Sequence, residues 1–228
     1  MTYEPLPLPP RATLSDDEAL QRVEAFRDEM RTRRTIRHYE PRPVPEAVIR
    51  AAIEAAGTAP SGANQQPWHF AAISDPDMKA QIRAAAEKEE EKFYDGGAGH
   101  AWLAALEPIG TGVSKPHLTD APWLIAIFAQ RYGLNADGTR YKHYYVPESV
   151  GIATGMLITA LHRAGLVSLT HTPNPMAFLN ALLGRQENEK PVMILAVGHA
   201  AKDATVPKAA TVKKPIDEIM TIHQGGED

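Results

Sequence analysis

The chain has 228 residues, with 24 Lys and Arg side chains against 28 Asp and Glu side chains, so its formal net charge is −4. It contains no cysteine, which excludes a disulfide framework, thiolate metal sites and a cysteine nucleophile. A hydrophobic content of 43% is too high for a disordered chain, and the mild acidity gives no reason to expect nucleic-acid binding. No apolar run is long enough to span a bilayer and no secretory leader is visible. We therefore expect a cytoplasmic globular protein without a membrane partner.

A proline-rich stretch opens the chain and predicts an extended N-terminal arm over residues 1–14. Ser15 followed by Glu18 is a capping-box pattern, and apolar residues then recur at helical spacing, which predicts a helix over 16–31. The remaining patterns predict, in chain order, helix 45–57, strand 68–73, helix 75–94, a helical patch at 101–106, strand 123–129, helix 147–164, strand 166–170, helix 174–184, strand 192–197 and a short helix at 217–222. The partial alternation of strands and unequal helices indicates one α/β or α+β domain over 1–228.

Five arginines lie close together at the end of the first predicted helix and just after it, namely Arg31, Arg33, Arg34, Arg37 and Arg42. Forked guanidinium groups beside a helix end suit a phosphate group. On charge alone, an ordinary solvated basic face stays open as the alternative. A nucleic-acid role is disfavoured because the run is short and has no interleaved aromatic residues.

A polar loop over residues 60–68 is the second candidate for chemistry. Gly62 and Ala63 leave their backbone N–H groups uncovered, so a planar ligand could approach them closely. The loop also carries hydroxyl and amide side chains that match the edge of a heterocycle. The alternative is a plain polar connection between a helix and a strand.

Glu90, Tyr94 and Lys115 form the third candidate. Glu90 and Tyr94 are four residues apart and therefore share one helix face. A carboxylate, a phenol and an ammonium group together would match an amino-acid zwitterion. The alternative is that Glu90 belongs to a charge run over 87–92, which would only solvate its helix.

The last candidate is the hydroxyl-rich strand end over residues 170–173, whose hydroxyls could donate to a cofactor or merely cap a turn. The nine histidines show no metal-ligand spacing, so no metal site is expected. Neither a Walker loop nor a Gly-x-Ser-x-Gly elbow occurs.

Together, these segments resemble the nitroreductase superfamily of flavin enzymes and, within it, the iodotyrosine deiodinases. Residues 33–37 look like the family's Arg-Arg-Ser-Val-Arg segment, and residues 59–68 resemble the deiodinase loop over the flavin. Deiodinases also place a Glu, a Tyr four residues later and a Lys about twenty residues beyond it, which Glu90, Tyr94 and Lys115 match. The resemblance extends over about residues 25–222.

The resemblance implies an α+β protein with a three-layer α/β/α nitroreductase-like fold, in which helices flank a mixed central sheet. It also implies a domain-swapped homodimer with FMN at the interface. The N-terminal arm and a C-terminal arm over about 205–228 would then embrace the second subunit, and residues from about 88 to 118 would form an active-site lid.

The resemblance also implies a role for individual residues. The FMN phosphate would be held by Arg33, Arg34 and Lys213. The rest of the cofactor would contact Thr35, Arg37, Ser61, Gly62, Thr170, His171 and Thr172. The hydroxyl of Thr172 would lie at flavin N5 as the catalytic group. Ala63 N–H would bind the substrate phenolate, Glu90 its ammonium group, and Lys115 and Tyr94 its carboxylate.

Several positions depart from the family pattern. Lys213 stands where animal relatives carry Arg, which replaces a bidentate phosphate grip by a point charge. Thr35 replaces a Ser, and His171 replaces a Thr. Residues 95–99 are glycine-rich where relatives are more charged, so ordering of the lid is expected to cost more here.

The function implied is FMN-dependent reductive dehalogenation of halotyrosines, with electrons from NAD(P)H directly or through a reductase. One alternative is a general NAD(P)H-dependent nitro- or quinone reductase of the same fold, which would be indifferent to a zwitterionic substrate. Another is a flavin- or amino-acid-binding protein without catalysis, which would bind its ligand but form no product.

Overall fold

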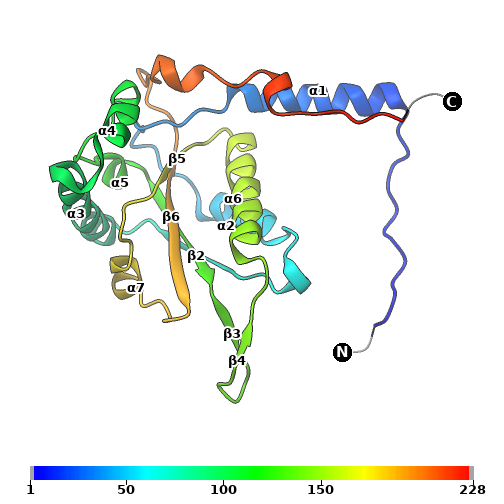
Figure 1. Ribbon diagram of the computed structural model, residues 1–228, viewed down its shortest axis with the longest axis horizontal. Coiled ribbons are helices and arrows are strands. Elements are labelled where there is room, and N and C mark those ends of the chain that lie inside the picture. The colour runs from blue at the N-terminus through cyan, green and yellow to red at the C-terminus, as the bar shows by residue number, and fades with distance from the viewer. Residues whose placement is uncertain (1–2, 226–228) are drawn as a thin grey trace. The chain divides into compact units, whose positions relative to one another are not determined.

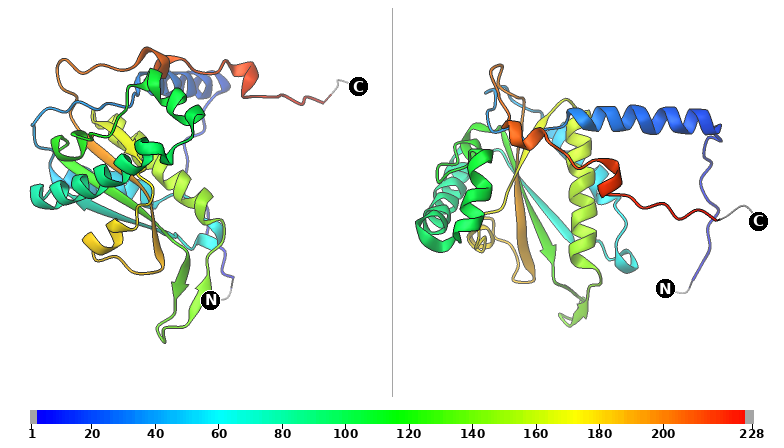
Figure 2. Two further views of the ribbon diagram at one scale, coloured as in Figure 1. Left: turned by 60° about the vertical axis from the view of Figure 1, so that its left-hand side comes forward. Right: turned by 45° about the horizontal axis from the view of Figure 1, so that its top comes forward.

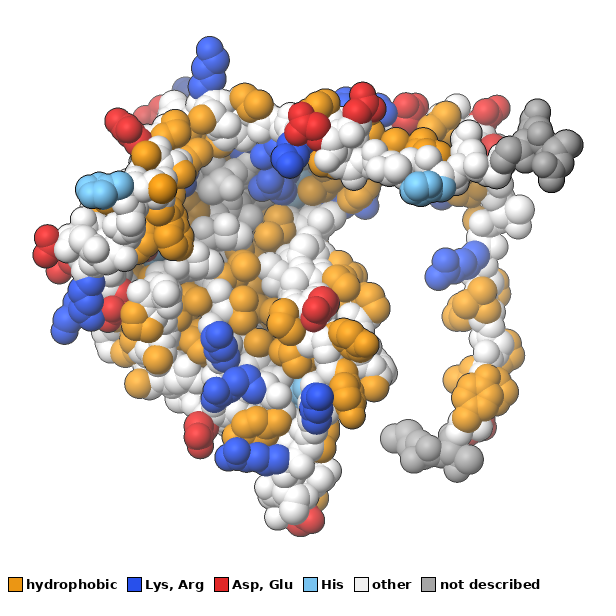
Figure 3. Space-filling model, in the orientation of Figure 1, with side chains coloured by type: hydrophobic (Ala, Val, Ile, Leu, Met, Phe, Trp, Pro, Cys, Tyr) orange, Lys and Arg blue, Asp and Glu red, His pale blue; other side chains and the backbone are white. Residues whose placement is uncertain are grey.

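The computed structural model describes residues 3–225, and the chain divides into two compact units between Arg33 and Arg34. In the first unit, residues 3–15 have no helix or strand, and Figure 3 shows exposed apolar side chains along this stretch. Helix α1 (Asp16–Thr32) follows, with the predicted capping box: Ser15 N–H donates to the Glu18 carboxylate at 2.9 Å, and Ser15 Oγ accepts the Glu18 N–H at 3.3 Å.

The apolar stripe of α1 is uncovered. None of its residues is buried, and Val23 and Phe26 are 66% and 44% exposed. An amphipathic helix is normally stabilised by packing of its apolar face rather than by propensity alone. The apolar residues of this stripe are therefore exposed.

The second unit holds every strand of the described chain. Its elements are α2 (Glu46–Gly57), η1 (Gly62–Asn64), β1 (Trp68–Ile73), α3 (Pro76–Lys92), η2 (Phe93–Gly97), α4 (His100–Leu106), η3 (Glu107–Ile109), α5 (His117–Asp120), β2 (Trp123–Gln130), β3 (Tyr132–Leu134), β4 (Arg140–Lys142), α6 (Val146–Arg163), β5 (Val167–His171), α7 (Phe178–Leu182), β6 (Glu189–Gly198), η4 (Lys208–Thr211) and η5 (Ile216–Glu218).

Four of these strands form the central sheet in the order β1-β2-β6-β5, and all neighbouring strands are antiparallel. The only parallel pairing in the described residues is an isolated bridge between Thr35 and Ser168 of β5. The sheet expected to be mixed is thus antiparallel in its named strands. Its parallel component is confined to this bridge, because the chain from Arg34 onward runs beside β5 only briefly.

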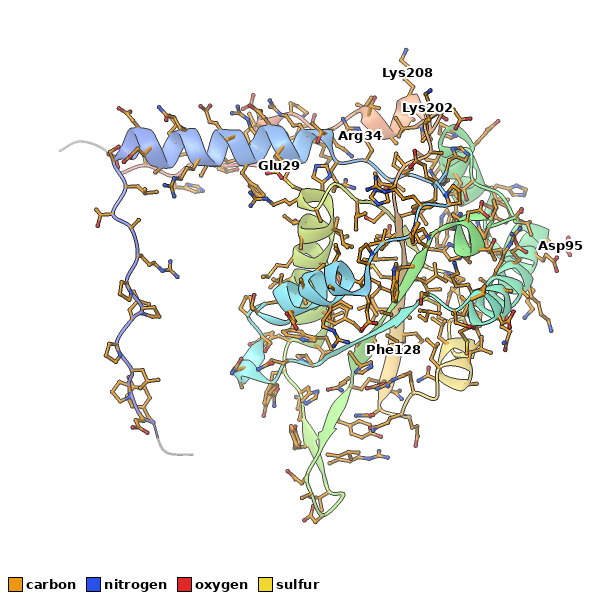
Figure 4. The ribbon with its side chains drawn as sticks, turned by 180° about the vertical axis from the view of Figure 1, so that it is seen from behind. Glu29, Arg34, Asp95, Phe128, Lys202 and Lys208 are labelled. Carbon is orange, nitrogen blue, oxygen red and sulfur yellow. The ribbon has the colours of Figure 1, made fainter. Side chains whose placement is uncertain are left out.

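Alternation along β2 creates two apolar cores. Leu124 and Phe128 face α3, α5 and α7, whereas Ile125 and Ile127 face α2 and α6. All four side chains are fully buried, and each such side chain adds about 1.5–3 kcal/mol of hydrophobic stabilisation. A one-residue slip would exchange the two faces, so this pattern specifies the register. Figures 1 and 2 show the resulting helix–sheet–helix layers, which confirm the three-layer prediction. Figure 4 labels Phe128 on β2 within the sheet.

Some boundaries differ from the sequence predictions for identifiable reasons. The helix expected over 75–94 changes at Phe93 into a π-helical turn, which accommodates Gly96 at φ 99°. Strand β6 is longer than the predicted 192–197, because it pairs with β2 as far as Gln130 opposite Glu189. The expected helix over 174–184 is shortened to α7, and the one at 217–222 is the single 3₁₀ turn η5.

A buried lysine ties α3 to α5. Lys79 is 7% exposed, and its Nζ donates to the carbonyl oxygens of Ala121 at 2.8 Å and Thr119 at 3.2 Å. Burial lowers the pKa of Lys79. Its ammonium group thereby satisfies carbonyl oxygens at the end of a short helix that would otherwise lack donors.

Replacing Lys79 by Met should lower the free energy of unfolding by about 1–3 kcal/mol, because it leaves two carbonyl oxygens without a donor in a buried place. Urea unfolding followed by circular dichroism measures the change. The matched control is Lys88→Met on the exposed face of the same helix, expected to stay within about 0.5 kcal/mol of the wild type. Equal losses in both variants would contradict the account of Lys79.

Candidate active site

One cavity of about 520 Å³ gathers much of the predicted chemistry. The predicted site residues in its lining are Arg37, Glu90, Tyr94, Lys115, Thr170, His171 and Thr172. They come from the segment before α2, from α3 and η2, from the segment before α5 and from β5 and the residue after it, so the fold brings together residues that are far apart in sequence. No helix in the described part of the chain is long and apolar enough to cross a membrane.

An ion pair between Glu90 and Lys115 lines this cavity. Lys115 Nζ is 3.0 Å from Glu90 Oε2, and the two side chains are 4% and 13% exposed. The same Nζ donates to the carbonyl oxygen of Gly112 at 2.6 Å and lies 5.7 Å from the ring centroid of Tyr94. Either charge alone would be costly to bury, so each depends on the other.

Helix α3 sets the geometry of this pair. It begins at Asp75, whose carboxylate accepts the N–H of Met78 at 2.7 Å. One turn before Glu90, Glu87 accepts the backbone N–H of Lys115 at 2.6 Å. Burial raises the pKa of Glu87, but this hydrogen bond, together with the hydrogen bond and the charge of Arg83, outweighs burial. The pKa of Glu87 is therefore lowered, and its carboxylate holds the Lys115 segment against the helix.

Two buried histidines form the floor of the cavity. The rings of His117 and His171 meet edge to face with their centroids 5.4 Å apart. Burial, followed by the charge of Lys115, lowers the pKa of His117 to about 4. Burial, followed by His117 and Lys115, lowers the pKa of His171 to about 3. Both imidazoles are therefore neutral near pH 7, and the Nε2 atom of each is buried without a hydrogen-bond partner.

These shifts predict a loss of stability in mild acid. Below pH 6.5 the unfolded chain binds a proton on each of these histidines, but the folded chain does not until about pH 4 for His117 and about 3 for His171. Each group therefore removes up to about 1.4 kcal/mol of stability per pH unit as the pH falls through that window.

The matched comparison is urea unfolding of the wild type and of His117→Gln at pH 7.5 and 5.0. Between these pH values the wild type should lose about 2 kcal/mol more than the variant, which has no imidazole at this position to charge. Parallel losses in the two proteins would show that His117 is not held neutral by the fold.

The loop predicted to contact the flavin is anchored elsewhere. The side-chain amide of Gln65 donates to Lys142 O and accepts the Tyr144 N–H, both at 2.8 Å, and the Gly62 N–H donates to Ser149 Oγ at 3.4 Å. These contacts attach the loop to the chain entering α6. It contributes no residue to the lining of the 520 Å³ cavity.

The predicted site is therefore only partly assembled within one chain. Arg33 belongs to the first unit. Within the second unit, the predicted residues outside the cavity lining are Arg34, Thr35, Ser61, Gly62, Ala63 and Lys213. Thr35 is nevertheless held beside β5 by its bridge to Ser168, so the segment from Arg34 to Arg37 leads directly to the cavity.

Sequence reasoning missed the aromatic wall of the cavity. Phe93 packs edge to face on both Trp102 and Tyr94, with centroids 5.1 and 5.3 Å apart, and Trp102 is 61% exposed. It also missed His117. The adjacency of Phe93 to Tyr94 and the lone Trp in the glycine-rich stretch were the available signals.

A second, larger and mainly apolar cavity of about 870 Å³ adjoins the first. It lies between α6 and β6, and both cavities are lined by Thr172, Asn174 and Pro175. Thr172 therefore stands at the boundary of two spaces, one charged and one apolar. A planar, amphipathic group at this threonine could extend into both.

Comparison with known proteins places the chain in a family. The Nitroreductase family profile matches residues 30–199. An iodotyrosine deiodinase of Haliscomenobacter hydrossis is 48% identical over 196 residues, which cover 86% of this chain and 88% of the relative. Human iodotyrosine deiodinase 1 is 44% identical over 206 residues, covering 90% and 71%. A crystal structure of oxidized iodotyrosine deiodinase bound to FMN and 3-iodo-L-tyrosine aligns with a TM-score of 0.73 at 28% identity, covering 88% of this chain and all of that one. The chain therefore belongs to the nitroreductase family and, within it, to the iodotyrosine deiodinases.

Proposed function

We propose that this protein is an FMN-dependent oxidoreductase that removes halide from halotyrosines by reduction. The observation that carries the proposal is the buried Glu90–Lys115 ion pair, with Tyr94 beside it, in a cavity that ends at Thr172. Its relatives of 43–48% identity are named iodotyrosine deiodinases, and one solved relative holds FMN and 3-iodo-L-tyrosine.

The polar groups around Thr172 fit FMN. Hydroxyls of Thr170 and Thr172 at the end of β5 can meet the ring nitrogens, and Arg37 can meet its polar edge. Arg33, Arg34 and Lys213 would hold the phosphate, and Thr35, Ser61 and Gly62 would contact the rest of the cofactor. When bound and reduced by NAD(P)H or dithionite, FMN would supply the two electrons that, with one proton, convert the carbon–halogen bond to carbon–hydrogen and release halide.

The ion pair is suited to a zwitterion because Glu90 and Lys115 can each exchange the other for the oppositely charged group of the ligand. The ligand ammonium would pair with Glu90 and the ligand carboxylate with Lys115, so one opposite-charge contact becomes two without any net buried charge. Tyr94, beside Lys115, would donate a hydrogen bond from its hydroxyl group to the same carboxylate. A ligand without the ammonium group would leave the buried Glu90 carboxylate without a counter-charge, which is costly. The site therefore favours ligands that carry both an ammonium and a carboxylate group.

The donor predicted for the opposite end of the substrate lies outside the lining of this cavity. The predicted donor is the Ala63 N–H, which belongs to the loop anchored at α6 and outside the cavity lining. We infer a homodimer in which the partner's Ala63 holds the phenolate. The uncovered stripe of α1 and the exposed Ile152 of α6 supply apolar surface for such an interface.

We further propose that the chain is a single functional domain with a lid over about 88–118. This segment contains η2, α4 and η3, and its Trp102 is 61% exposed, so closure over a ligand would bury an aromatic ring. The arms at 1–14 and about 205–228 would reach the partner. A cytoplasmic location stays a prediction.

The direct test is turnover. Dithionite-reduced, FMN-loaded protein is mixed with 3-iodotyrosine without oxygen, and products are separated by chromatography. Stoichiometric tyrosine and iodide are expected. An absence of both, with rapid NAD(P)H-driven reduction of a nitroarene instead, would favour the nitro- or quinone-reductase alternative. Ligand binding without any product would favour a non-catalytic binding protein. NADPH-driven turnover also tests whether NAD(P)H donates directly or needs a reductase.

A further inference from the structure

His171 occupies an unusual position in the cavity. Its side chain is 7% exposed, and its Nε2 atom has no hydrogen-bond partner although it is fully shielded from solvent. Leaving a buried polar atom unpaired is unfavourable, and native structures contain few such atoms. An unpaired atom in a cavity wall therefore marks a place where a ligand atom can complete the hydrogen bonding.

The unpaired Nε2 lies beside the carboxylate assigned to the ligand ammonium. It is 4.0 Å from Glu90 Oε1, which is too far for a hydrogen bond, and Glu90 instead pairs with Lys115 through its other oxygen. The lining of the cavity also contains the charged or titratable residues Arg37, Glu89, Glu90, Lys92, Tyr94, Lys115 and His117. Glu89 pairs with Lys92 at 2.9 Å, so Glu90 is the carboxylate that lies beside both His171 and Lys115.

We propose that His171 is a specificity-determining residue whose Nε2 accepts a hydrogen bond from the α-ammonium group of the amino-acid substrate, beside the ion pair to Glu90. The inference rests on the function proposed above. An ammonium group has three N–H bonds, and the Glu90 carboxylate leaves at least one of them without an acceptor. A neutral imidazole 4.0 Å from this carboxylate can accept that hydrogen bond, and the lowered pKa of His171 is consistent with a neutral ring.

This assignment separates His171 from its neighbours on β5. The exposed Thr170 and the buried His171 alternate along the strand, so their side chains point to opposite faces. The hydroxyls are thus available to the cofactor, and the imidazole faces the amine end of the cavity. The Thr-to-His departure from the family pattern would then add an amine contact rather than a flavin contact.

The test measures binding of three ligands to oxidised, FMN-loaded protein by quenching of flavin fluorescence. They are 3-iodotyrosine, its N,N-dimethyl derivative with one N–H, and its des-amino analogue with none. His171→Leu should weaken 3-iodotyrosine binding about tenfold, as expected for loss of a hydrogen bond to a charged donor. Binding of the two analogues should change less than twofold, because their contact to His171 is already absent.

His69→Leu is the control. It is a half-buried histidine of β1 outside the cavity lining, so its replacement should leave all three affinities within twofold of the wild type. Equal weakening of all ligands by His171→Leu would assign His171 to packing and overturn the proposal, as would no change for any ligand. If the wild type bound no 3-iodotyrosine at all, the proposed function itself would fail.

Discussion

Lys115→Met should weaken binding of 3-iodotyrosine by about 100- to 1000-fold, while FMN content changes little. The reason is that Lys115 is 3% exposed and forms the only ion pair described for Glu90 other than the long contact to His171. In the complex, loss of Lys115 would leave the ligand carboxylate buried without its counter-charge, at a cost of about 3–4 kcal/mol. Each 1.4 kcal/mol corresponds to about tenfold in affinity.

Two controls make the Lys115 result specific. Lys88→Met removes the same charge from an exposed position of α3 and should leave binding within about twofold. Glu90→Gln combined with Lys115→Met removes both charges. This double variant should be more stable than Lys115→Met alone but should still bind 3-iodotyrosine weakly. Titration of flavin fluorescence reports binding, and urea unfolding reports stability. Equal losses of FMN and ligand in Lys115→Met would show that Lys115 supports the whole site.

Gly62→Ala is expected to lower FMN affinity at least about tenfold without unfolding the chain. A Cβ atom at Gly62 would lie 2.6 Å from the backbone oxygen of Tyr144 and 3.0 Å from its carbonyl carbon. Neither atom can move without moving the start of α6, so the loop itself must shift. Gly57→Ala is the matched control, because nothing lies within 4 Å of its added Cβ atom. Unchanged flavin retention in Gly62→Ala would contradict the role given to this loop.

The same variant tests whether the loop acts on the other subunit. If the site combines one chain's Lys115 with the partner's Gly62 loop, a mixed dimer of Lys115→Met and Gly62→Ala chains contains one intact site. Random mixing after unfolding and refolding should then restore about a quarter of the wild-type activity. Activity that stays at the level of the separate variants would place loop and cavity in one subunit, or the chain in a monomer.

Local features of the fold could be predicted from the sequence. The capping box at Ser15 and the apolar runs of β2 and β6 are short-range signals, so α1 and the central strands were placed close to their observed bounds. Glu90 and Tyr94 both line the cavity, as their spacing of four residues predicts. The change to π-helical hydrogen bonding at Phe93 does not move Tyr94 to another face of the helix.

The remainder depended on contacts that no local pattern encodes. The separation of the Gly62 loop from the Glu90 cavity follows from tertiary anchoring at α6, which sequence spacing does not reveal. The pairing of His117 with His171 joins α5 to β5 and likewise has no periodic signal. The predicted positions of Arg33 and Lys213 at a phosphate stay predictions.

The cavity around Glu90 and Lys115 is expected to bind an amino-acid zwitterion. Isothermal titration of oxidised, FMN-loaded protein with 3-iodotyrosine and with 2-iodophenol tests this binding, because the two ligands share the halogenated phenol and differ in the charged end. We expect 3-iodotyrosine to bind at least about 100-fold more tightly, since only it pairs with both buried charges. Affinities within about threefold of each other would contradict it.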